Sequence, residues 1–235
     1  MELPTSMRRL HSLVTADGML HLSVDEVPVP SPAAHEVLVR VDAAPINPSD
    51  LGLLLAAADL GGLRADDDGR SVSAPIPAEA MGGLQARLGL AMAVGNEGAG
   101  VVVAAGEAAE AQALLGRTVG MVGGEMYADY RCLPAASCLP MPDGVTAEQA
   151  ASPFVNPMTV LAMLETMRRE GHMAIVHTAA ASNLGQMMVR ACAADGIPLV
   201  NVVRRSEQAD LLRSLGAEHV VDSSSASYLD DLTAA

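Results

Sequence analysis

The sequence is almost without aromatic residues: its 235 residues include one Phe, three Tyr and no Trp. Half of the residues are nevertheless hydrophobic, so Ala, Val, Leu and Met must fill the interior. A chain of this length can bury a substantial core, either as one large domain or as two small ones.

Basic residues are also scarce. The 14 Lys and Arg residues stand against 28 Asp and Glu, which gives a formal net charge of −14. This charge argues against a nucleic-acid groove or an anionic membrane surface as partner. No apolar run reaches membrane-spanning length, and the first residues lack the apolar core of a signal peptide. We therefore expect a soluble cytoplasmic protein that has neither a membrane nor a nucleic acid as partner.

Cysteine is rare as well. Cys132, Cys138 and Cys192 make no disulfide framework and no paired metal motif, which is typical of a reducing compartment. The acidic run Asp66–Gly69 is predicted to be a solvated turn, because no further ligands follow at calcium-loop spacing.

Short strands separated by Gly and Pro characterise the first 140 or so residues. Short strands separated by Gly and Pro residues are typical of a barrel-like or sandwich-like β unit. We expect a domain over residues 1–150. Its predicted strands are Val24–Val29, Glu36–Val41, Val101–Ala105, Arg117–Val122 and Tyr127–Leu133.

The pattern changes after Thr146, which opens a capping box with Gln149. Asn156 is predicted to cap the following helix, with Pro157 at its first position. From there strands and helices alternate as β-α-β-α-β, the unit of a doubly wound parallel sheet. We expect this second domain over residues 151–235. Its predicted strands are Met173–Thr178, Leu199–Val203 and His219–Asp222, and its next helix is Leu184–Ala194 with Gly196 as C-cap.

The turn after the first of these strands is built of small residues, Ala179-Ala-Ala-Ser-Asn-Leu-Gly185. Small residues allow the backbone to approach a pyrophosphate, whose charge is stabilised at the helix N-terminus. The alternative is a turn that only packs a helix on a sheet. We predict cofactor contacts from Ala181, Ser182, Asn183, Leu184 and Gly185.

Two arginines follow the second strand. Arg204 lies 19 residues beyond Gly185, where an NAD site usually places an acid that binds the ribose hydroxyls. A guanidinium matches a 2′-phosphate instead. The alternative is a solvated surface pair, but Arg204 and Arg205 favour NADP(H) in so acidic a chain.

Three stretches together resemble the medium-chain dehydrogenase/reductases, especially their quinone-oxidoreductase and enoyl-reductase branches. They are Ala44-Pro-Ile-Asn-Pro-Ser-Asp50, Gly95-Asn-Glu-Gly-Ala-Gly100, and Gly171 through Asp222. The resemblance implies an α/β protein with a GroES-like β-barrel domain and a partial Rossmann domain. It also places Asn156 and Thr159 on the helix that borders the cofactor cleft.

Zinc-dependent members carry a Cys in the first motif and Gly-His-Glu in the second. Here Asn47 or Pro48 stands in place of the thiolate, and Asn96 replaces the His. Zinc needs thiolate, imidazole or carboxylate ligands, so we expect no metal. The resemblance then implies NADPH-dependent reduction of a quinone or an α,β-unsaturated carbonyl. Asn47 would lie beside the nicotinamide, and Asp50 would orient its loop or only stabilise a turn.

Two other functions stay open: an enoyl-thioester reductase, and a non-catalytic nucleotide-binding or sensor protein on the same fold. Enoyl-reductase relatives carry a Tyr proton donor after the first motif, and Leu51–Leu63 contains no Tyr. A doubly wound domain has six strands, of which only three are expected here, on the adenosine side. Either the chain is a fragment of a longer protein or a partner chain completes the sheet. We favour the fragment, which would bind the adenosine 2′-phosphate weakly and would not turn over. Relatives are commonly homodimers.

Overall fold

The computed structural model describes residues 3–66 and 69–235, and the chain divides into two compact units, Met1–Pro153 and Phe154–Ala235. Asp67 and Asp68, in the middle of the predicted Asp66–Gly69 turn, lie outside the described residues.

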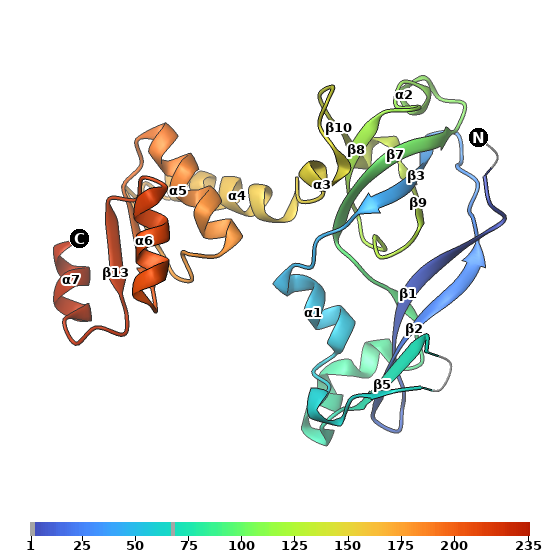
Figure 1. The fold of residues 1–235 in the computed structure, drawn as a ribbon, viewed down its shortest axis with the longest axis horizontal. Helices are drawn as coiled ribbons and strands as arrows, with labels where there is room; N and C mark the ends of the chain where they lie inside the picture. Colours follow the sequence, from blue (N-terminus) through green and yellow to red (C-terminus); the bar gives the residue numbers. More distant parts are fainter. Residues whose placement is uncertain (1–2, 67–68) are drawn as a thin grey trace. The chain divides into compact units, whose positions relative to one another are not determined.

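Two antiparallel sheets of five strands each build the first unit (Figure 1). One sheet has the strand order β4-β5-β2-β1-β6 and the other β10-β8-β7-β3-β9. The strands are β1 (Ser6–Val14), β2 (Met19–Pro28), β3 (Glu36–Ala43), β4 (Arg64–Ala65), β5 (Ser71–Pro75), β6 (Met92–Ala93), β7 (Glu97–Ala105), β8 (Thr118–Val122), β9 (Tyr130–Pro134) and β10 (Cys138–Pro140). Short helices connect them: α1 (Pro48–Leu55), η1 (Leu60–Gly62), η2 (Ala78–Arg87), α2 (Ala109–Gln112), η3 (Ala135–Ser137) and α3 (Ala147–Ala150).

Each sheet of this unit has its own aliphatic core. The core of the second sheet includes Val37, Val39, Val119 and Met121, and a smaller one around Val14 and Leu20 supports the first sheet. A close approach of β3 and β7 explains one glycine of the second motif, because a Cβ on Gly100 would collide with the carbonyl of Arg40. The β-rich barrel-like prediction for this part of the chain is confirmed.

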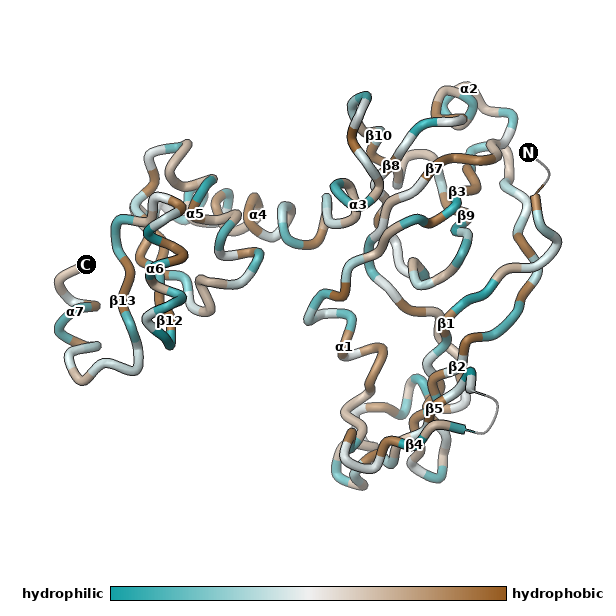
Figure 2. Tube along the Cα trace, in the orientation of Figure 1, coloured by the Kyte–Doolittle hydropathy of each residue, from teal (hydrophilic) through white to brown (hydrophobic). Residues whose placement is uncertain are grey.

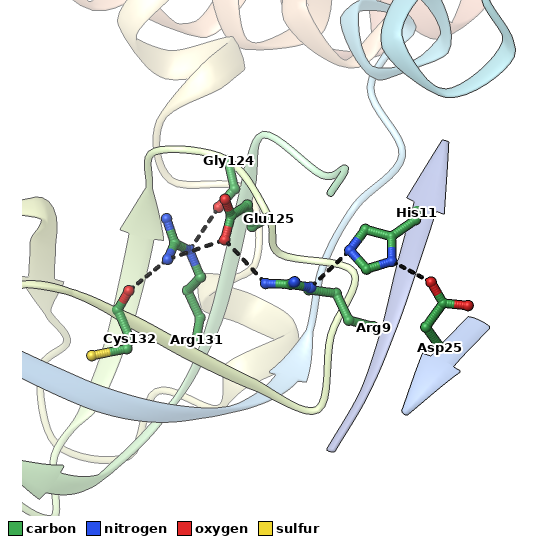
Figure 3. A network of polar contacts seen from close by, with 7 residues as sticks. All are labelled: Arg9, His11, Asp25, Gly124, Glu125, Arg131 and Cys132. Atoms are coloured by element: carbon green, nitrogen blue, oxygen red, sulfur yellow. Dashed lines mark hydrogen bonds and ion pairs between the residues drawn. The ribbon is translucent and has the colours of Figure 1, made fainter. Parts of the chain in front are cut away.

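A polar network joins β1 and β2 to the segment between β8 and β9 (Figure 3). The Nδ1 atom of buried His11 lies 2.6 Å from the Asp25 carboxylate. The Nε of Arg9 donates to the Nε2 of His11 at 3.0 Å, so the ring proton sits on Nδ1 and is donated to Asp25. Glu125 lies within 3.7 Å of the Arg9 guanidinium and within 3.3 Å of that of Arg131. These polar contacts link β1, β2, the segment before β9 and β9 itself.

A three-stranded parallel sheet with the order β11-β12-β13 forms the second unit, as predicted. Its elements are α4 (Val155–Arg169), β11 (Ile175–His177), α5 (Asn183–Asp195), β12 (Leu199–Val203), α6 (Ser206–Ser214), β13 (His219–Asp222) and α7 (Tyr228–Ala234). All five residues of β12 are buried, which is typical of a strand with parallel neighbours. Figure 2 shows a brown, hydrophobic stretch in β13, whose sequence includes two valines.

Helix ends in this unit follow the expected residues at some positions and not at others. Ser182 caps α5 by accepting a hydrogen bond from the Gly185 N–H, and Gly196 closes the helix in the left-handed region. The predicted cap at Asn156 is wrong: α4 begins at Val155, and Phe154 occupies the N-cap. Asn156 therefore lies in the first turn, where Pro157 is tolerated because N–H groups there have no helical partner.

No described helix is both long enough and apolar enough to cross a membrane.

Candidate functional site

A pocket of about 590 Å³ opens in the second unit where β11 and β12 end. In parallel sheets this carboxyl edge is where ligands bind. The lining residues come from the turn after β11, the end of β12 and the segment after β13: Thr178, Ala179, Ala180, Ala181, Ser182, Val202, Val203, Arg204, Arg205, Gln208, Ser223 and Tyr228. The structure thus brings the small-residue turn and the two arginines to one cavity.

The turn is tight because its residues are small. Ala179 has a φ of +54°, in the left-handed region that favours glycine. Gly185 packs so closely against the turn that a Cβ there would collide with the carbonyl of Ala180. Ser182, at the N-cap, accepts from the Gly185 N–H, and the N–H groups before it at the start of α5 have no partner within the helix. These groups are suited to binding an anion.

Arg204 and Arg205 are both exposed at the end of β12. The backbone N–H of Arg204 donates to the side chain of Gln208 at 3.1 Å. Within the part of the chain that the structure describes, neither guanidinium makes a hydrogen bond or an ion pair. Two unpaired cations on one pocket wall are suited to a phosphate, which a guanidinium binds through paired hydrogen bonds.

The remaining residues predicted to bind the cofactor in this unit lie elsewhere. Leu184 packs against the core that α4, α5 and β12 share, and Asn183 is exposed at the start of α5. Thr159 is exposed on α4, where its hydroxyl donates to the carbonyl of Val155, and it lines a separate apolar groove. Asn156 is half-buried in the first turn of the same helix.

In the first unit, a buried carboxylate ties two sequence motifs together. Asp50 is 2 % exposed. One of its carboxylate oxygens accepts a hydrogen bond from the backbone N–H of Asn47 at 2.7 Å, and the other accepts from that of Asn96 at 2.8 Å. One carboxylate thus holds both the start of α1 and the backbone at Asn96.

Asn47 is 4 % exposed, and its side chain donates to the carboxylate of Glu97 at 2.9 Å. Glu97, at the first position of β7, is fully buried and also accepts from the hydroxyl of Ser152 at 3.0 Å. A buried carboxylate that accepts two hydrogen bonds is compensated for much of its lost hydration. The Asn47 amide is thus held in a fixed orientation.

Tyr127 closes this cluster. Its hydroxyl donates to the carbonyl of Pro45 at 2.9 Å. Burial, together with the nearby charge of Asp50, raises the pKa of Tyr127 to about 12. The phenol therefore stays protonated near neutral pH and anchors the loop before Asn47.

The chain is similar in sequence to known oxidoreductases. Residues 33–143 match the alcohol dehydrogenase GroES-like domain. The chain is 30 % identical over 208 residues to the mitochondrial enoyl-[acyl-carrier-protein] reductase of Xenopus tropicalis, covering 85 % of this chain and 51 % of that protein. It is 31 % identical over 143 residues to the quinone oxidoreductase of Pseudomonas aeruginosa, covering 60 % of this chain and 44 % of that protein.

Solved structures show the same likeness. A protein from Mesorhizobium loti described as an NADPH:quinone reductase superposes with a TM-score of 0.71 at 28 % identity, covering 99 % of this chain and 64 % of its own. The Escherichia coli quinone oxidoreductase complexed with NADPH shares the fold, with a TM-score of 0.66 at 20 % identity over 92 % of this chain and 58 % of its own. The chain spans about half the length of the frog relative.

The chain belongs to the medium-chain dehydrogenase/reductase superfamily, in its quinone oxidoreductase and enoyl reductase branch. The GroES-like β-barrel and the partial Rossmann sheet predicted from the sequence are both confirmed.

The zinc positions of this superfamily can now be located in space. Asn47 and Asn96 both bind the Asp50 carboxylate through their backbone N–H groups, and Asn96 also donates from its side chain to the Ser49 hydroxyl. Neither position offers a thiolate or an imidazole, so this donor set does not fit zinc. No cluster of three or more His, Cys, Asp or Glu residues suited to a metal occurs among residues 3–66 and 69–235.

Sequence reasoning missed Glu97, Ser152 and Tyr228. Glu97 could have been noticed, since a lone acid within the apolar, Gly-rich stretch of β7 must find partners when it is buried. Ser152 lies 55 residues from Glu97, and nothing local in the sequence indicates that contact. Tyr228 comes to the pocket only through the path of the chain after β13.

Proposed function

We propose that this protein is a zinc-independent, NADPH-dependent oxidoreductase that reduces a quinone or an α,β-unsaturated carbonyl. The observation that carries the proposal is the pocket after β11 and β12, where Arg204 and Arg205 face the same cavity as the small-residue turn. The NADPH complex of the Escherichia coli relative, which shares the fold, supports the choice of cofactor.

The pocket residues fit an adenosine 2′-phosphate. In an NAD site an acid at the end of the second strand binds the ribose hydroxyls and repels a 2′-phosphate. Here the acid is absent and two unpaired guanidinium groups stand in its place. The backbone N–H groups at the start of α5 are suited to the pyrophosphate, with Ala181, Ser182 and Gly185 allowing the close approach.

NADPH, when bound, supplies the hydride at its nicotinamide C4. The protein must orient the substrate and stabilise the negative charge that develops on the substrate oxygen. We propose Asn47 as a polar group at this reacting centre. The carboxylate of Glu97 holds its amide and Asp50 holds its loop, so this group is preorganised. Asn156 and Thr159 on α4 are proposed as further cofactor contacts.

The cofactor preference is tested by calorimetric titration of the purified chain with adenosine 2′,5′-bisphosphate and with AMP, followed by NADPH and NADH. We expect preference for the ligands that carry the 2′-phosphate. The double variant Arg204→Ala/Arg205→Ala should bind them about tenfold more weakly or worse, since hydrogen bonds to charged groups contribute about 1.5–3 kcal/mol. Its affinity for AMP and NADH should change little.

Arg190→Ala/Arg213→Ala is the matched control, because it removes two exposed positive charges from α5 and α6 outside the pocket. It corrects for the general change in net charge. If the double variant keeps the wild-type preference for the 2′-phosphate, the proposal for NADPH is wrong.

The substrate class is tested separately, by following NADPH oxidation by the whole protein with a benzoquinone, an enone or an enoyl thioester. Turnover of the quinone or enone supports the proposal. Turnover of the enoyl thioester alone would favour the second candidate, which the frog relative supports through its identity over 85 % of this chain. Binding of NADPH without turnover of any of these substrates would favour a nucleotide sensor.

We also propose that the protein works in the cytoplasm as a homodimer. Sedimentation equilibrium of the purified protein tests the second statement, and a mass equal to that of one chain at every concentration would refute it.

A further inference from the structure

The second unit contains another cavity, at the edge of its sheet opposite the proposed nucleotide pocket. It has a volume of about 350 Å³ and lies where α5 and α6 end and where β12 and β13 begin. Its apolar lining includes Val189, Ile197 and Leu199, and its polar lining is Asn201, Glu218 and His219. This volume lies in the range of small-molecule sites.

Asn201 is unusual for its position. It lies at the centre of β12, is 1 % exposed, and is the only polar residue among the five buried residues of that strand. Its Nδ2 donates to the carbonyls of Leu199 at 3.4 Å and of His219 at 3.2 Å. Its Oδ1 is buried and has no hydrogen-bond partner among the described residues.

The orientation of this amide is determined by its neighbours. If the amide were flipped, Oδ1 would face the two carbonyl oxygens and Nδ2 would lose both acceptors. Oδ1 therefore lies on the side of the amide away from Leu199 and His219, and Asn201 lines the cavity. A buried acceptor without a donor is costly, and an apolar residue of similar size would avoid that cost. Asn201 thus leaves an unmet acceptor beside the cavity, which a donor from a ligand would satisfy.

The charges around the cavity favour a cation as its ligand. Two helices of 13 and 9 residues, α5 and α6, end at this cavity, and helix C-termini carry partial negative charge. Glu218 adds an exposed carboxylate. None of the lining residues is Lys or Arg, and His219 is the one lining residue that can become cationic. The opposite edge of the sheet, with its helix N-termini and free arginines, has the reverse polarity.

We propose that this cavity binds a small aliphatic primary ammonium ion. The ammonium group would donate to Oδ1 of Asn201 and be attracted by the carboxylate of Glu218, while its carbon chain would pack on Ile197 and Leu199. This site is independent of the proposed nucleotide pocket, and no activity of the protein is needed to detect it.

The test is a titration of the ¹⁵N-labelled chain with propylammonium chloride, followed by NMR. We expect saturable shifts of the Asn201 side-chain amide and of the backbone amides of Gly196 and Gly216. Propan-1-ol, which has the same chain without the charge, should bind about tenfold more weakly, since a charge-assisted hydrogen bond is the stronger one. Propionate should not bind.

Two variants locate the contact. Asn201→Leu should lose the propylammonium response, because it removes the acceptor oxygen. Glu218→Gln, a surface change that leaves the core intact, should weaken binding a few-fold at low salt, and less as salt screens the charge. Thr233→Leu, an exposed site on α7 outside both cavities, is the matched control.

Absence of saturable shifts, equal binding of the alcohol and the ammonium ion, or an unchanged affinity in both Asn201→Leu and Glu218→Gln would each overturn the proposal. Titration with adenosine 2′,5′-bisphosphate in the same samples reports separately on the nucleotide pocket.

Discussion

Burial changes the acid–base behaviour of single residues here, and Tyr127 is the clearest case. The phenol donates to the carbonyl of Pro45, and burial together with Asp50 raises its pKa to about 12. An unperturbed tyrosine titrates near pH 10, so ionisation of this one opposes folding. The stabilising effect is complete below pH about 10 and is lost as the pH rises toward the folded pKa.

This behaviour can be seen directly, because the chain has three tyrosines and no tryptophan. We predict that an alkaline titration followed by tyrosinate absorbance has a late step near pH 12, which Tyr127→Phe removes. Tyr130→Phe, the control, should leave that step in place. A single step of all three tyrosines near pH 10 in the folded protein would contradict the prediction.

For Asp25 the pKa is shifted in the opposite direction, so its stabilising effect depends on pH in the opposite way. The hydrogen bond from His11 holds the pKa of its carboxyl below the ordinary range, against a smaller opposing effect of burial. The stabilisation is therefore present above the unfolded pKa of about 3.9 and is lost as the pH falls through the folded one. Because the Asp25 side chain is 45 % exposed, we expect about 0.5 kcal/mol or less.

Urea unfolding between neutral and acid pH measures this contribution. Asp25→Asn should be slightly less stable than the wild type at neutral pH, and the difference should vanish at the acid end. Asp143→Asn replaces an exposed acid that has no hydrogen-bond partner among the described residues, and it serves as control. A difference that is constant with pH would refute the role of this hydrogen bond.

Among the helices, packing requires a glycine in α5 but not the one in α1. Gly185, in its first turn, faces the carbonyl of Ala180, whereas Gly52 in α1 is exposed with open space around its Cβ position. We predict that Gly185→Ala costs about 2–3 kcal/mol of unfolding free energy, because the backbone must shift. Gly52→Ala, the matched change in an open helix, should gain about 0.5–1 kcal/mol.

Denaturant unfolding followed by circular dichroism measures both effects. The Gly185 variant should also lose affinity for adenosine 2′,5′-bisphosphate, since the turn that lines the pocket would move. Equal stability changes for the two substitutions would mean that the close approach at Gly185 does not constrain the fold.

Sequence patterns predicted some of these elements well because those elements follow local rules. The strand Leu199–Val203 and the cap at Gly196 were expected and are present, since buried apolar runs and glycine caps are local features. The strand β1 was missed because its sequence, Ser6–Val14, does not alternate. Its Arg9 and His11 are accommodated by the polar network with Asp25 and Glu125, which involves residues distant in the sequence.

In the candidate site, too, contacts between residues close in sequence could be predicted, and contacts between distant residues could not. The turn and the arginines of the second unit lie within 27 residues of one another, and their convergence follows from the rules of parallel sheets. The contact between Asn47 and Glu97 joins residues 50 positions apart. Composition and periodicity carry no information about such a contact, so Glu97 emerges only from the fold.

At the scale of the whole molecule, the main feature of the second unit is an open sheet edge. Among the described strands, β11 has a neighbour on one side only. Val176 within it is 60 % exposed, and Met173 shortly before it is 84 % exposed. An exposed apolar edge strand is a template for pairing with another chain. We predict that the 235-residue chain associates with itself in a concentration-dependent way through this edge.

Val176→Lys should lower that association, because a lysine on an edge strand opposes strand pairing between chains. Val24→Lys is the matched control: Val24 is 39 % exposed and lies on β2, which has neighbours on both sides in its sheet. Sedimentation velocity over a range of concentrations measures the effect, with a shift toward the monomer for Val176→Lys alone. Equal association of both variants and the wild type would mean that the chains do not associate through the edge of β11.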